Sequence, residues 1–182
     1  MREVVVQTVK RYYEIGDKSS YVKNCESIWE MPTKILDFCK IRGVEVQQLL
    51  QNKNQVWPSA KWLFTVPHSQ WTNEIEVIFS SNFMVSKLAP VYYIQHEFSL
   101  PNLERESLSP VLDGYGTQAY TFIQQDLEDM ISAQLGNMGY EKISYAELHE
   151  VVCALEFPKG VSVFGPQVSV EYALFHDLLD HC

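Results

Sequence analysis

The chain has 182 residues, of which 46% are hydrophobic and 20% are charged, the composition of a folded protein rather than a disordered one. Residues 1–90 hold 11 Lys/Arg and 9 Asp/Glu, whereas residues 91–182 hold 3 and 14, and the formal net charge is −9. This excess of acid argues against binding to nucleic acid or to an anionic membrane surface, and it favours a basic partner.

The N-terminal part of the chain is expected to be helical. Apolar residues recur at helical spacing over 2–14, although the triple valine there also suits a strand, and Gly16 ends this segment. A second helix is predicted from Pro32 to Gly43, because proline is tolerated in a first turn and glycine ends helices. We interpret residues 44–50 as a further turn or two of helix.

The pattern changes to strands over residues 62–98. Glu74 to Phe79 alternate charged and apolar side chains, and Ser81 with Asn82 predicts a tight turn. Residues 91–98 are rich in β-branched and aromatic side chains, which makes them the clearest strand of the chain. We expect a short antiparallel meander here.

The last part of the chain is expected to be mainly helical. Residues 101–116 are predicted to be a loop, and an apolar stripe over 117–135 predicts the clearest helix. A capping box that begins at Ser144 predicts a helix over 145–155. Residues 169–179 predict a final helix, or a strand that becomes a helix.

These segments predict a single α+β domain, because no linker or internal repeat divides the chain. Its parts are a helical stretch (1–52), an antiparallel β-meander (about 62–98) and a mainly helical stretch (117–180). The first residues lack the layout of an export signal and no apolar run could span a bilayer, so we expect a cytoplasmic protein. Its cysteines are then expected to be free thiols: Cys25, Cys39, Cys153 and Cys182.

No motif with the spacing of a catalytic, phosphate-binding or metal-binding site is present, so we nominate no catalytic residue, metal ligand or cofactor. His149 and Cys153 are four residues apart on a predicted helix, but the apolar neighbours of Cys153 favour a small buried side chain over a thiolate nucleophile. His176, Asp180 and His181 lie near the C-terminus, where too few ligands gather for a metal and a solvated helix end is the simpler interpretation.

His96 lies on the apolar side of the 91–98 strand, so we expect it to be buried and hydrogen-bonded to backbone, with Glu97 on the other face. A histidine in that setting is a part of the core rather than a catalytic base.

The remaining candidates are acidic residues of the second half and a tyrosine among them. We expect them to gather on one acidic surface that binds a basic protein: Glu104, Glu106, Asp113, Tyr115, Asp126, Glu128, Asp129, Glu147 and Glu150. This predicts an immunity- or antitoxin-type inhibitor that neutralises a toxin-like basic domain, such as a nuclease, through protein–protein interaction.

Two alternatives remain. One is a small enzyme whose catalytic residues are dispersed along the chain, and it requires a pocket lined by titratable groups with perturbed pKa values. The other is an adaptor or subunit of a larger assembly that uses the aromatic-rich segment 56–71 as its contact.

Overall fold

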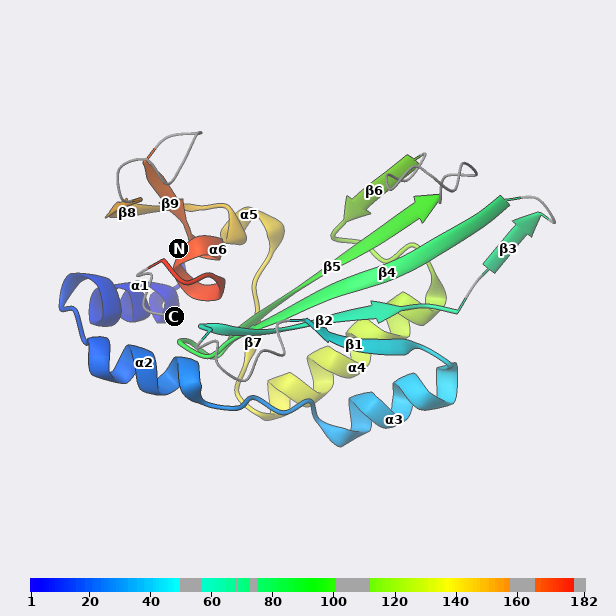
Figure 1. The fold of residues 1–182 in the computed structure, drawn as a ribbon, viewed down its shortest axis with the longest axis horizontal. Helices are drawn as coiled ribbons and strands as arrows, with labels where there is room; N and C mark the ends of the chain where they lie inside the picture. Colours follow the sequence, from blue (N-terminus) through cyan, green and yellow to red (C-terminus); the bar gives the residue numbers. More distant parts are fainter. Residues whose placement is uncertain (50–56, 68, 73–74, 101–111, 158–165, 179–182) are drawn as a thin grey trace.

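The computed structural model describes residues 1–49, 57–67, 69–72, 75–100, 112–157 and 166–178. A largely antiparallel sheet forms its centre, with helices at both ends of the sequence (Figure 1). The predicted α+β class, with a meander-like sheet in a single domain, is confirmed.

The described helices come before and after the strands of the sheet. They are α1 (Glu3–Val9), which continues as the π-helical turn η1 (Lys10–Glu14), α2 (Lys18–Glu26), α3 (Thr33–Arg42), α4 (Phe122–Asn137), α5 (Tyr145–Leu148) and α6 (Val170–Phe175). In the described residues, the main path of the sheet runs β1-β2-β4-β5-β6. Its strands are β1 (Glu45–Leu49), β2 (Ser59–Thr65), β4 (Ile75–Ser86), β5 (Val91–Leu100) and β6 (Leu112–Gly116).

Shorter strands extend this arrangement. β3 (Ser69–Thr72) pairs with the beginning of β4, and β7 (Glu141–Lys142) runs parallel to the beginning of β5. A separate pair consists of β8 (Val151–Glu156) and β9 (Gln167–Ser169).

One side of the sheet, which we call the helix face, is covered by α3 and α4 (Figure 1). Phe83 of β4 and Ile94 of β5 lie on this side and pack with Leu127 and Ile131 of α4 in a fully buried core. Burial of such large apolar side chains is the main stabilising contribution that joins these helices to the sheet.

The other side, which we call the open face, carries the alternate residues of the same strands. The register places Lys61 of β2 beside Met84 of β4 and Met84 beside Tyr93 of β5, and the next row places Asn82 beside Gln95. No helix of the described residues lies over the β5–β6 end of this face (Figure 1).

Both ends of the chain cover the opposite end of the open face. There α1, α6 and the β8–β9 pair enclose a second core with strand β5 (Figure 1). Buried Ser59 and Ser86 donate hydrogen bonds from Oγ to the carbonyls of Phe175 (2.8 Å) and Leu174 (2.9 Å). These bonds fix α6 to β2 and β4.

Local signals placed several helix ends correctly. Gly43, with φ 70°, ends α3 as predicted. Helix α4 ends close to its predicted position but begins at Phe122 rather than at residue 117, because Thr121 forms a capping box with Gln124 there. Ser144 caps α5 in the same way with Glu147. The segment before α6 adopts the strand-then-helix alternative, because β9 leads directly into the helix.

The prediction of helix at residues 44–50 is wrong, because β1 occupies its described part as an edge strand of the sheet. Its side chains are exposed along nearly the whole strand, so it lacks the apolar alternation that identifies strands.

The turn predicted at Ser81 and Asn82 is also wrong. Both residues lie inside β4, where Ser81 pairs with His96 and Asn82 with Glu97 through side-chain hydrogen bonds.

Two further boundaries differ from the prediction. The loop expected over 101–116 contains strand β6, in which a Cβ on Gly114 would lie 2.5 Å from the Phe98 ring. The helix expected over 145–155 is only α5, because the chain then forms β8 and pairs with β9. The last part is therefore less helical than expected.

Helix α2 was not predicted, although the Asp17 carboxylate caps it by accepting from the Ser20 N–H.

Candidate functional site

The acidic residues singled out from the sequence lie on different sides of the sheet. Asp126, Glu128 and Asp129 belong to α4 and the helix face, whereas Glu147 of α5 and Glu150 just after it lie on the opposite side (Figure 1). Glu104 and Glu106 lie outside the described residues. The described members of the set therefore do not gather on one surface.

Several of these carboxylates are paired with cations of the chain itself. Asp126 contacts Arg42 at 2.7 Å, Glu128 pairs with Lys142, and Glu150 accepts from the N-terminal amine at 2.7 Å. Arg2 binds Glu147 at 2.6 Å, and its hydrogen bond is the main reason that the pKa of this carboxyl is lowered to about 2. Internal pairing reduces the charge that these groups offer to a partner.

Asp113 and Tyr115 lie elsewhere, on β6 at the uncovered end of the open face. With Glu97 of β5 they border a hollow of about 510 Å³. Glu97 accepts hydrogen bonds from the amides of Asn82 (2.5 Å) and Gln95 (3.1 Å). Among the described residues neither Glu97 nor Asp113 has an ion-pair partner within 4.0 Å, so both can contact an incoming cation.

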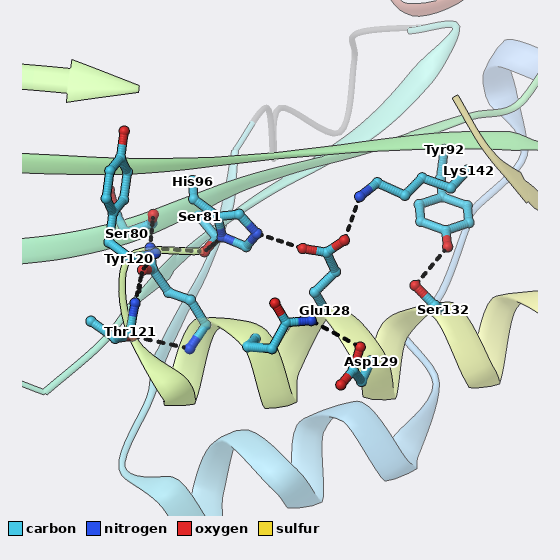
Figure 2. Close-up of polar contacts among 12 residues, drawn as sticks. Ser80, Ser81, Tyr92, His96, Tyr120, Thr121, Glu128, Asp129, Ser132 and Lys142 are labelled. Carbon is cyan, nitrogen blue, oxygen red and sulfur yellow. Dashed lines mark hydrogen bonds and ion pairs between the residues drawn. The ribbon is translucent and has the colours of Figure 1, made fainter. Parts of the chain in front are cut away.

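A network of polar side chains lies between the sheet and α4 (Figure 2). His96 Nδ1 lies 2.9 Å from Ser81 Oγ, and His96 Nε2 lies 2.7 Å from the Glu128 carboxylate, which also pairs with Lys142. The order serine, histidine, carboxylate is that of a hydrolase triad. No sequence motif indicated this network, because its members lie on three separate elements.

Burial excludes this network from catalysis in the conformation described. Ser81 and His96 are both 0% exposed, and a nucleophile needs contact with its substrate. Gln124 adds a hydrogen bond from its amide to the Ser80 carbonyl at 2.7 Å (Figure 2). The network satisfies buried polar groups and fixes α4 on the sheet. His96 is buried as predicted, but its ring nitrogens contact the side chains of Ser81 and Glu128 rather than the backbone.

A second group of polar residues is accessible. A pocket of about 330 Å³ lies on the open face where α5 and α6 meet the sheet. Lys61, Tyr93 and Gln95 border it from the strands, and His149 and Glu171 border it from the helical side. This pocket joins elements that are far apart in the sequence, so no local motif could have revealed it.

The Glu171 carboxylate is the charged centre of this pocket. Its Oε1 lies 3.4 Å from His176 Nε2, and its Oε2 lies 3.7 Å from His149 Nδ1. The hydrogen bond with His176 is the main cause that lowers the pKa of Glu171. Glu171 is therefore an anion at neutral pH, placed to hold an imidazole on either side.

Three further groups of the pocket have perturbed pKa values: Lys61, Tyr93 and Tyr145. Burial lowers the pKa of the Lys61 ammonium and raises the pKa of Tyr93 to about 12. The interaction with Tyr115 raises the pKa of Tyr145. Perturbed groups of this kind occur in binding sites as well as in enzymes, so the shifts do not by themselves identify an enzyme.

Of the histidine and cysteine arrangements considered from the sequence, the described residues test the pair His149 and Cys153. Cys153 lies in β8 and does not share a helix with His149, and because it is exposed, the expectation of a buried side chain is wrong. Cys25 and Cys39 are buried free thiols, and Cys182 lies outside the described residues. His176 contacts Glu171, whereas Asp180 and His181 also lie outside the described residues.

The aromatic segment 56–71 is partly core. Trp62 is 4% exposed and packs against Trp29 with ring centroids 5.0 Å apart, and Phe64 is fully buried. These two rings are not available to a partner of an adaptor, and the side chain of Trp71 is outside the described part of the structure.

Within the described ranges, no cluster of three or more His, Cys, Asp or Glu is arranged to hold a metal ion. No helix there has both the length and the apolar character needed to cross a bilayer. Comparisons of the chain with protein-family models, curated proteins and solved structures found no match.

Proposed function

We propose that the protein binds and neutralises a basic protein partner, as an immunity- or antitoxin-type inhibitor does, and that the partner docks at the β5–β6 end of the open face. The observation that carries this proposal is the hollow bordered by Glu97, Asp113 and Tyr115. It combines two carboxylates that have no ion-pair partner among the described residues with a tyrosine side chain that is 63% exposed.

This combination suits an arginine or lysine side chain. A carboxylate binds the cationic head by charge-assisted hydrogen bonds, and an aromatic ring contacts the same cation through its face. Tyrosine is also a common anchor at protein interfaces. The acidic excess of the second half of the chain adds a long-range attraction that accelerates association.

If the proposal is right, the gene adjacent to this one should encode a toxin-like protein with a basic C-terminal domain, and the test uses that domain. Co-expression with the wild-type protein should protect cells from that domain and yield a complex. The double variant Glu97→Gln/Asp113→Asn should then associate about tenfold more slowly at low salt, measured by surface plasmon resonance.

The matched control is Asp126→Asn/Asp129→Asn, which removes the same charge from α4 on the other side of the sheet. Its association rate should stay close to that of the wild type. Equal slowing by both double variants would show that the hollow is not the docking site. Failure of the adjacent gene product to bind would contradict the neutralising role.

A further inference from the structure

The pocket on the open face has a floor of sheet residues and a wall of helical residues. Lys61, Met84 and Tyr93 form one row across strands β2, β4 and β5. Leu148 at the end of α5 and Glu171 of α6 border it from above the sheet. Its volume of about 330 Å³ is that of a site for a small molecule.

Lys61 is the unmatched charge of this pocket. It is half-buried, and within the described part of the chain its ammonium has no ion pair or hydrogen bond. Glu171 is near enough to attract it, but that carboxylate is engaged by His149 and His176 and not by Lys61 at ion-pair distance. An ammonium that has lost water without gaining a partner is stabilised most by an incoming anion.

The remaining walls suit an apolar body with one polar end. Tyr115 and Tyr145 are 63% and 40% exposed and border the pocket, whereas Tyr93 and Leu148, which also line it, are each only 2% exposed. Gln95 lies beside them, with its oxygen accepting from the Tyr93 hydroxyl at 3.1 Å. A small aromatic or aliphatic molecule could pack on these surfaces while its charged end reaches Lys61.

We propose that this pocket binds a small organic monocarboxylate, with the Lys61 ammonium as its charge partner and the tyrosine rings packing on its apolar body. A monoanion fits because Lys61 provides one unmatched positive charge. A phosphate dianion would need further cations or several N–H donors. Glu171 would moreover repel a dianion more strongly than a monoanion. The pocket shares Tyr115 with the Glu97–Asp113 hollow, but the proposal does not depend on a basic partner docking at that hollow.

The test compares benzoate with benzamide, which has the same shape but no charge. Isothermal titration and ligand-detected NMR should show saturable binding of benzoate to the wild-type protein and at least about tenfold weaker binding of benzamide. Lys61→Met keeps the length of the side chain and should weaken benzoate binding by about tenfold or more. Lys40→Met, which removes an exposed lysine of α3, should leave it unchanged.

A second measurement needs no variant and therefore does not depend on how Lys61→Met folds. Benzoate should raise the pKa of Lys61 in the wild-type protein, followed through the side-chain NMR signals of that lysine. Absence of saturable benzoate binding, equal affinity for benzamide, or benzoate binding that leaves the Lys61 signals unchanged would each overturn the proposal.

Discussion

Replacing Glu128 by glutamine should destabilise the protein by about 2 kcal/mol at neutral pH. The Glu128 carboxylate binds His96 at 2.7 Å and also pairs with Lys142, and its side chain is 15% exposed. A hydrogen bond to a charged group contributes about 1.5–3 kcal/mol when buried, and glutamine retains part of this bonding. In a chain of this length the loss corresponds to a fall of roughly 4–8 °C in the melting temperature.

The effect should depend on pH in a defined direction. The hydrogen bond with His96 and the pairing with Lys142 lower the pKa of Glu128 below its ordinary value of 4.5. A carboxyl whose pKa is lowered by folding stabilises the folded state fully above its unfolded pKa. That contribution is lost as the pH falls through the folded pKa. The difference in the free energy of unfolding between the wild type and Glu128→Gln should therefore have its full value at pH 7 and should shrink below about pH 4.5.

Urea unfolding followed by tryptophan fluorescence measures this difference at each pH. The control is Asp129→Asn, on the next residue of α4, where the side chain is exposed and accepts only from Gln125. It should change stability by no more than about 0.5 kcal/mol. Two results would refute the assignment of Glu128 as a buried anchor of α4. One is a Glu128→Gln variant that unfolds at the wild-type urea midpoint at pH 7, and the other is a stability difference that stays constant as the pH falls.

Three other substitutions test the remaining structural assignments. Arg2→Ala should move the pKa of Glu147 upward from about 2 toward its ordinary range, measured by NMR titration of the carboxyl, because the Arg2 hydrogen bond is the main cause of the shift. Ser86→Ala should cost about 1–3 kcal/mol in urea unfolding, since it leaves the buried Leu174 carbonyl without its donor. Gly136→Ala should raise stability by up to about 1 kcal/mol, because a Cβ at this place in α4 meets nothing within 4 Å.

The sequence predicted best where structure depends on neighbours along the chain. Strand β5 follows from its own β-branched and aromatic residues, α3 from its apolar positions and its terminal glycine, and α4 from its apolar stripe, although its cap at Thr121 was not predicted. The prediction failed where contacts with residues distant in the sequence determine the local structure. Ser81 and Asn82 are typical of turns, yet both remain in β4 because His96 and Glu97 of β5 bind their side chains.

The candidate site was predictable only in part for the same reason. Asp113 and Tyr115 were selected from the sequence, and the structure places them together at one hollow, but Glu97 was seen only as a residue facing away from His96. Neither Lys61 nor Glu171 was selected, because nothing near them in the sequence suggests a pocket that β2 and α6 form together. Counting charges along the chain also could not show that Arg2 and Arg42 pair with acids more than 80 positions away.

Access, more than hydrogen-bond geometry, separates the two polar clusters of this protein. Ser81, His96 and Glu128 have the shorter contacts, but Ser81 and His96 are buried between the sheet and α4 and are hydrogen-bonded there. The groups around Lys61 and Glu171 have longer contacts, and the Lys61 ammonium beside the pocket has no partner among the described residues. A satisfied, buried network stabilises a fold, whereas an accessible charge that folding has partly desolvated gains free energy from a ligand. The open face is therefore where binding should be sought.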